Sequence, residues 1–354
     1  MGRGPCAGSP LSSCLTPEAA LARGSWVKLI CGASNQDLAA IEDLCGVFAL
    51  AGVHCIDVAA DGAVVAAARR GIVWAEARGA ARPWLMVSLS DGADPHFRKA
   101  WFAPQRCPPA CPRPCERVCP ALAIGVAATG APGVLAERCY GCGRCLPACP
   151  HGLIEERDQV LEVGGVAPLL THLRPDAVEL HTQPGREAAF AGRVAQVVAS
   201  GVPLQRLSVS AGLEGKAQSP AALAGELWQR FALLRAQGLR PLWQLDGRPM
   251  SGDVGAGTAH AAVKLAAGVL ACAPPGPVQV AGGTNAHTLP QLQASPALRR
   301  HIAGVAFGGV ARRLLQPLLL EAQSRGRPLL ADGTLWPEAL ALAQALVAPW
   351  LEQT

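Results

Sequence analysis

The stretch CYGCGRCLPACP, residues 139–150, decides how the centre of this chain folds. Its cysteines have the spacing C-x2-C-x2-C-x3-C-P, which is typical of bacterial ferredoxins. Three thiolates two residues apart wrap one cuboidal iron–sulfur cluster, and Gly141 and Gly143 free the backbone to curl around it. The fourth cysteine, followed by proline, turns away to ligate a neighbouring cluster. The stretch therefore predicts one cluster and indicates a second.

A second run of cysteines, CPPACPRPCERVCP at 107–120, lies upstream with the wider spacing C-x3-C-x3-C-x3-C-P. The crossover rule assigns one cluster to Cys107, Cys111, Cys115 and Cys149, and the other to Cys139, Cys142, Cys145 and Cys119. Because of the wide spacing, the first cluster is expected to be either a [4Fe–4S] or a [3Fe–4S] centre. A pair of zinc sites is the alternative, but such sites usually separate two CxxC knuckles by a longer loop.

The composition fits a large α/β protein. The chain has 354 residues, 50% hydrophobic, 4% aromatic and 16% charged, as expected of the aliphatic core of a parallel sheet. The net charge of +5 is spread along the chain without a basic block, which argues against nucleic-acid binding. The N-terminus lacks the pattern of a signal peptide and no apolar run is long enough to span a bilayer, so we expect a cytoplasmic protein.

Fourteen cysteines in a reducing compartment indicate metal binding rather than disulfides. Those outside the two runs have no partner at ligand spacing and are interpreted as ordinary apolar or surface residues: Cys6, Cys14, Cys31, Cys45, Cys55 and Cys272.

Outside the cysteine runs, a strand-then-helix pattern recurs. Strands are expected at 26–31, 55–60, 84–89, 177–181, 207–210, 242–245, 278–281 and 302–306, with Ala- and Leu-rich helices between most of them, for example at 37–51, 186–200 and 221–237. Eight such units predict a closed (β/α)8 barrel, with an open doubly wound sheet as the alternative. The expected organisation is a tail at 1–24, barrel at 25–90, an inserted ferredoxin-like module at 91–159 and barrel again at 160–354.

Polar residues alternate with apolar ones along the expected strands. Helices cover the outside of a barrel, so the apolar face should point outward and the polar face into the lumen. The residues expected to converge there are Lys28, Asp57, Glu179, His181, Gln244 and Asp246, with Ser208 and Ser210 on the same face of their strand. They would form either a self-satisfied ionic network or a ligand or vestigial catalytic site.

Two glycine-rich turns follow the last two expected strands. Barrels often bind a phosphate between these loops, through backbone N–H groups and a helix N-terminus. The candidate ligand-binding residues are Gly282, Gly283, Thr284, Gly308 and Gly309, with Arg248 from the loop after the sixth strand. Glycine pairs are common in any turn, so ordinary turns are the alternative.

Several stretches together resemble the LdpA family, the light-dependent period proteins of the cyanobacterial circadian clock. They are WVKLICGAS at 26–34, CIDVAAD at 55–61, RPWLMVSL at 82–89, DPHFRK at 94–99, ERCYGCGRC at 137–145, WQLDGRPMSG at 243–252 and AGGTN at 281–285. The resemblance runs from about residue 24 to about 347, and the residues before Ser25 match nothing in the family.

The resemblance implies a redox-active iron–sulfur protein that passes light-dependent redox state to the circadian clock, without an established enzymatic reaction. It implies clock proteins as partners, and a redox partner such as a quinone or a ferredoxin is a further expectation. The first hypothesis is thus a redox sensor or relay. The second is a barrel oxidoreductase using a flavin or phosphorylated ligand, with the clusters as electron carriers. The third is that the clusters are structural staples. The barrel has no reaction-specific motif, which favours a regulatory protein over an enzyme.

Overall fold

The computed structural model describes residues 15–126, 132–158, 161–213, 219–248, 253 and 255–352. Eight parallel strands close into a barrel in the order β1-β12-β11-β10-β9-β8-β3-β2. The strands are β1 (Trp26–Ile30), β2 (Cys55–Ala59), β3 (Trp84–Ser90), β8 (Ala177–His181), β9 (Arg206–Gly212), β10 (Pro241–Asp246), β11 (Val278–Ala281) and β12 (Gly304–Phe307). The predicted (β/α)8 barrel is therefore confirmed and the open sheet is excluded. The ends differ from the expected ones by at most two residues, as at the end of β9 and the start of β12.

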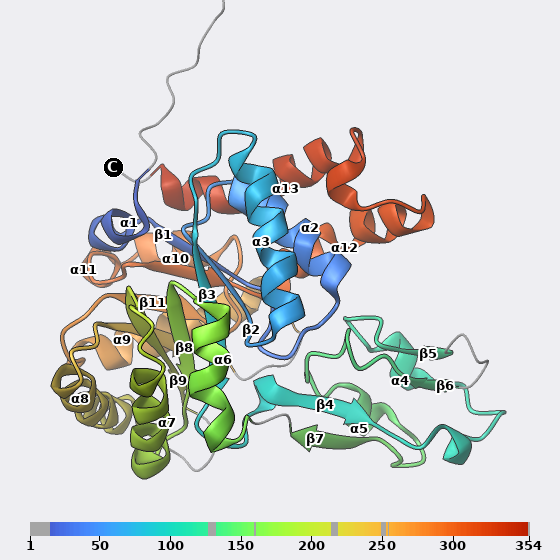
Figure 1. The fold of residues 1–354 in the computed structure, drawn as a ribbon, viewed down its shortest axis with the longest axis horizontal. Coiled ribbons are helices and arrows are strands. Elements are labelled where there is room, and N and C mark those ends of the chain that lie inside the picture. Colours follow the sequence, from blue (N-terminus) through green and yellow to red (C-terminus); the bar gives the residue numbers. More distant parts are fainter. Residues whose placement is uncertain are drawn as a thin grey trace, which may run out of the picture.

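Helices surround the barrel because their apolar faces pack against the outward side chains of the strands (Figure 1). They are α2 (Leu38–Leu50), α3 (Gly62–Glu76), α6 (Val166–Leu173), α7 (Glu187–Ala199), α8 (Pro220–Ala236), α9 (Ala259–Leu270), α10 (Thr288–Gln293), α11 (Pro296–Arg299), α12 (Gly309–Ser324) and α13 (Leu335–Leu351). Short 3-10 turns η3 (Val163–Gly165), η4 (Ala256–Thr258) and η5 (Leu329–Ala331) precede α6, α9 and α13. Several helices begin at a side-chain cap; Asp37, for example, accepts a hydrogen bond from the Ala40 amide.

The segment predicted as a tail contains a short helix, α1 (Pro17–Arg23), that packs at one end of the barrel. Its buried Ala20 and Leu21 contact the first residues of several strands, Trp26 among them. Glu18 is ion-paired with Arg206 and Arg240, which tie the helix to β9 and the start of β10. The helix thus covers the N-terminal end of the strands, whereas residues 1–14, with Cys6 and Cys14, lie outside the described residues.

The chain between β3 and β8 leaves the barrel as a separate lobe beside the C-terminal ends of the strands (Figure 1). Two antiparallel pairs shape it: β4 (Arg98–Trp101) with β7 (Glu155–Asp158), and β5 (Ile124–Val126) with β6 (Pro132–Val134). Its short helices are η1 (Pro95–Phe97), η2 (Pro104–Arg106), α4 (Pro114–Arg117) and α5 (Cys145–Ala148). The lobe starts and returns through one strand pair, so all eight cysteines of the two runs are carried on a single stem.

None of the helices built by the described residues combines the length and the apolar character that crossing a membrane requires.

Candidate metal centres and the adjoining barrel mouth

One set of four cysteines in the lobe surrounds a common cavity. Cys119, Cys139, Cys142 and Cys145 all line it, although Cys119 comes from the upstream run. These are the four residues that the crossover rule assigns to one cluster. Two short helices bring the four residues together. Cys145 is the first residue of α5, and Cys119 comes two residues after α4, where the chain turns back toward the downstream loop.

The backbone around this cavity presents N–H groups to sulfur. The amide of Ala100 donates to Cys139 Sγ at 3.3 Å, and the amide of Ala123 donates to Cys119 Sγ at 3.2 Å. In the thiol form, burial and, after it, the three neighbouring cysteines together raise the pKa of Cys145 to about 12. Four thiolates gathered around one cavity need a cation between them, so the residues fit a metal cluster.

The other set, Cys107, Cys111, Cys115 and Cys149, also lies together. Burial raises the pKa of Cys107, and the adjacent Cys111 and Cys149 contribute to the rise; Cys149 acts likewise on Cys115. Cys149 is different, because backbone N–H groups led by that of Leu153 outweigh burial and lower its pKa. That amide donates to Cys149 Sγ at 3.4 Å. The sulfur of Cys149, which crosses from the downstream run, therefore ionises more readily than those of Cys107 and Cys115.

Two glycines explain how the downstream loop curls. Gly141 has φ 77° and Gly143 has φ 74°, in the left-handed region that favours glycine. A Cβ on Gly141 would stand 2.4 Å from the carbonyl oxygen of Arg98 and 2.5 Å from that of Pro95, whereas a Cβ on Gly143 would have only the end of Glu156 nearby, at 3.5 Å. The loop therefore lies directly against the backbone that leads into β4.

Polar contacts fix the lobe to the barrel beside this loop. Lys99 Nζ donates to Gln36 Oε1 at 2.7 Å and to the Ala136 carbonyl at 2.6 Å. The Gln36 amide donates to the Glu137 carbonyl at 2.8 Å. Tyr140, inside the cysteine motif, is buried with the guanidinium carbon of Arg312 4.3 Å from its ring centroid. Because Arg312 belongs to α12 of the barrel, the loop of the second cysteine set touches the barrel mouth directly.

The polar residues predicted for the lumen do meet there. Lys28 Nζ is ion-paired with Asp57 at 3.3 Å and, more closely, with Glu179, and all three side chains are 0–1% exposed. Burial alone would lower the pKa of Lys28, but the two carboxylates reverse this and raise it. Burial raises the pKa of Asp57 to about 6, while Lys28 and His181 outweigh burial and lower that of Glu179. A lysine held charged in this way is no nucleophile.

Further hydrogen bonds extend this network through residues that the sequence analysis did not single out. Ser88 donates to Asp57 at 2.8 Å, and Trp26 Nε1 donates to Gln279 Oε1 at 2.7 Å. Gln279 in turn donates to Gln244, and Gln244 donates to Glu179, both at 2.8 Å. The alternation VQVA in β11 carried the signal that would have placed Gln279 inside the barrel. The arrangement favours a self-satisfied network over a reactive site in the lumen itself.

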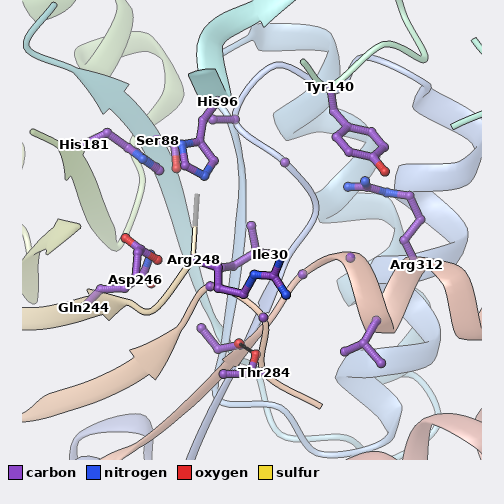
Figure 2. Close-up of a pocket in the computed structure, with 18 of the residues that line it drawn as sticks. Ile30, Ser88, His96, Tyr140, His181, Gln244, Asp246, Arg248, Thr284 and Arg312 are labelled. Atoms are coloured by element: carbon purple, nitrogen blue, oxygen red, sulfur yellow. Dashed lines mark hydrogen bonds between the residues drawn. The ribbon is translucent and has the colours of Figure 1, made fainter. Parts of the chain in front are cut away.

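Above this network, a cavity opens at the C-terminal mouth of the barrel (Figure 2). All the predicted ligand-binding residues line it: Arg248, Gly282, Gly283, Thr284, Gly308 and Gly309. The Thr284 hydroxyl is engaged, since it donates to the Ala306 carbonyl at 2.5 Å. Gly282 and Gly283 have φ 67° and 93°, and a Cβ on Gly282 would stand 2.8 Å from the Arg248 carbonyl oxygen, so these glycines serve loop packing.

Titratable groups gather on another side of the same cavity. His181 and Asp246, which were predicted for the lumen, border this cavity, and His96 joins them from the lobe. Figure 2 shows the three around one opening. Burial alone would lower the pKa of His181, but Glu179, 3.2 Å away, raises it to about 9. Burial raises the pKa of Asp246 to about 6. His96 Nδ1 contacts Asp94 at 2.8 Å. His96 and Tyr140 both come from the lobe and Arg312 from α12, so only the tertiary fold brings them to the mouth.

The sequence of this chain matches two family models. Residues 169–349 match the Light dependent period A C-terminal domain, and residues 107–160 match the LdpA Fe-S cluster-binding domain. The second range contains all eight cysteines of the two runs. A protein of Synechococcus elongatus, Light dependent period A, is 47% identical over 338 residues, which cover 94% of this chain and 93% of that protein.

Solved structures resemble the chain more remotely. A tryptophan synthase structure from Mycobacterium tuberculosis is 13% identical with a TM-score of 0.45, over 95% of this chain and 96% of that one. A thiamine phosphate pyrophosphorylase from Pyrococcus furiosus is 9% identical with a TM-score of 0.37, over 94% and 99%. Likenesses of this degree carry no argument about what the chain does.

Proposed function

Because the chain belongs to the Light dependent period A family and carries its iron–sulfur cluster-binding domain, we propose that it is a redox sensor or relay that couples light-dependent cellular redox state to the circadian clock. Two clusters are proposed, on the two crossed cysteine sets, the second a [4Fe–4S] centre and the first a [4Fe–4S] or [3Fe–4S] centre. When bound, such clusters supply one-electron chemistry. Clock proteins are the proposed downstream partners, and a quinone or a ferredoxin the proposed redox partner.

The observation that carries the proposal is the contact between the second cysteine loop and the barrel. Tyr140, between two cluster cysteines, packs against Arg312. The residues before it, Ala136 and Glu137, bind Lys99 of β4 and Gln36 of the loop between β1 and α2. A change of one charge beside this loop alters the electrostatic attraction of Arg312 and Lys99 for it. A change in cluster charge would therefore shift the contacts of Arg312 and Lys99, and the shift can reach the barrel surface through α12.

Hydrogen exchange on the anaerobic holoprotein tests this proposal, comparing the oxidised protein with protein reduced by dithionite. We expect altered protection in 135–145 and at the start of α12, with α8, which borders neither the cysteine cavity nor the contact between loop and barrel, as an internal comparison. Identical exchange in both states, in a sample whose clusters demonstrably change oxidation state, would reject sensing through this interface.

One observation favours a second candidate, a barrel oxidoreductase with the clusters as electron carriers. The barrel-mouth cavity has His96, His181 and Asp246 on its wall and Tyr140 of the cysteine loop beside it, so a bound ligand would lie next to the second centre. A flavin-shaped absorption spectrum of protein purified from its native source and denatured to release cofactors would support this candidate. Absence of flavin absorption in that sample would exclude an oxidoreductase that uses a flavin.

A further inference from the structure

We propose that the barrel-mouth cavity binds a small phosphate monoester, and that Arg312 couples its occupancy to the redox state of the second cluster. The binding site stands independently of the function proposed above, whereas the coupling rests on that function. Calorimetry therefore tests the binding site, and a redox titration tests the coupling.

The cavity has the size of a small polar metabolite. The space open to the centres of water-sized molecules is about 120 Å³, and a single water needs roughly 10–15 Å³ by that measure. This is room for a phosphate group and a short tail. The walls come from five barrel strands, β1, β3, β8, β10 and β12, and from the loops and helix beside them, which fix the shape of the site without the ligand.

One side of the cavity is built for an anion. Arg248 and Arg312 both border it, and Figure 2 shows the Arg248 guanidinium extending into the space between Ile30 and Thr284. Gly308 and Gly309 border it as well, and α12 begins there without a side-chain cap. The first-turn N–H groups of this sixteen-residue helix have no intrahelical acceptors, so the positive end of its dipole faces the cavity.

The opposite side is built for hydroxyl groups. Asp246 lies there, accepting from Ser210 and from Gln244 Nε2 at 3.2 Å, with His96 and His181 across the opening. The other carboxylate at the cavity, Asp253, is 3.2 Å from Arg248 in an exposed pair that solvent screens. A dianionic phosphate next to the arginines and a hydroxylated tail near Asp246 satisfy both sides. A purely apolar ligand satisfies neither side, and a cationic ligand is repelled by Arg248 and Arg312.

Arg312 connects this site to the cluster loop. Its guanidinium stacks 4.3 Å from the Tyr140 ring centroid and donates to the Cys31 carbonyl, while its buried Nε has no hydrogen-bond partner among the described residues. An anion in the cavity and an added electron on the second cluster would both draw on the positive charge of this side chain. Each therefore weakens the other, as linkage requires.

Calorimetry on the oxidised holoprotein tests binding, with inorganic phosphate and glycerol 3-phosphate as probes. Arg248→Gln should weaken binding of both at least tenfold. Gly309→Asp should do the same by repulsion, while an acidic residue in the first turn leaves the helix stable. Arg313→Gln is the matched control, because it removes an exposed cation from the same helix away from the cavity. No binding at millimolar probe, or equal affinity in all four proteins, would overturn the site.

A mediated titration followed by EPR tests the coupling. If reduction weakens binding tenfold, saturating glycerol 3-phosphate should make the midpoint of the second cluster about 59 mV more negative. Arg312→Gln, with iron content unchanged, should abolish most of that shift. An unchanged midpoint in protein that binds the probe would overturn the coupling and leave the proposed sensor intact. Failure of the clusters to titrate at all would overturn both the sensor and the coupling, while calorimetry still decides the site.

Discussion

Replacing Lys28 with methionine should destabilise the barrel more than any surface substitution can. Lys28 is fully buried and is the cation shared by Asp57 and Glu179, both of them also buried. Methionine nearly fills the same volume, so the main change is electrostatic. Breaking a buried ion pair from one side costs about 3 to 5 kcal/mol, because the partner is left charged without compensation. We place the loss near the upper figure, since two carboxylates depend on this lysine.

The loss should also depend on pH, with a sign that follows from Asp57. Its pKa is already raised to about 6 by burial, and removal of Lys28 raises it further. A carboxyl whose folded pKa lies above its unfolded value, about 3.9, contributes stability at low pH that is lost as the pH rises through the folded pKa. In the variant this loss extends above pH 6, at up to about 1.4 kcal/mol per pH unit. The variant's deficit relative to the native sequence should therefore grow from pH 6 to pH 8.

Urea unfolding of the holoprotein at pH 6, 7 and 8, followed by far-UV circular dichroism, measures this deficit. Lys28→Met/Asp57→Asn should recover a large part of the lost stability and show a flatter pH dependence. Arg313→Met, an exposed change on α12, should stay within about 0.5 kcal/mol of the native sequence. A Lys28→Met deficit below about 1 kcal/mol, constant over the pH range, would refute the view of the lumen as a buried ionic network.

The remaining predictions concern the clusters and one histidine. Cys149→Ser should remove the EPR signal of the first cluster and spare the second, while Cys119→Ser should do the reverse; loss of the signals in the opposite pattern would disprove the crossover. Gly141→Ala should lower the iron content strongly, because its Cβ would meet two backbone carbonyls, whereas Gly143→Ala should cost only about 1–2 kcal/mol for its positive φ; equal iron loss in both would contradict this. The pKa of His181 is raised to about 9, so its contribution to stability, complete below about pH 6.5, should decline as the pH rises toward 9. His181→Gln should flatten thermal melting temperatures over that range, and an unflattened profile would count against the assignment.

Much of the fold followed from local patterns in the sequence. The strands β1, β2, β8 and β11 begin where alternation and flanking helices placed them, because inward and outward side chains of a barrel strand face different surroundings. The same alternation placed Lys28 and Glu179 inside. The alternation predicted their positions correctly because the outer face of the strand packs against apolar helices, where an unpaired charge would be costly.

What the sequence did not predict depends on contacts between distant segments. Tyr140 belongs to the cysteine motif, yet its packing against Arg312 comes from the way the lobe folds back onto the barrel. His96 reaches the mouth for the same reason, from a short 3-10 turn without any strand or helix periodicity. The helix α1 was missed because it is one turn or two long, and its stability comes from the barrel end that it covers.

The two crossed iron–sulfur centres are the basis of the proposed function, and one measurement tests them directly. Iron and acid-labile sulfide should be counted in anaerobically purified protein, with EPR spectra before and after dithionite. We expect about eight iron and eight sulfide per chain, or about seven iron with eight sulfide if the first centre has three irons, and signals that change on reduction. Zinc in place of iron, with no sulfide, would contradict the presence of iron–sulfur clusters and leave a barrel whose lobe holds two zinc sites.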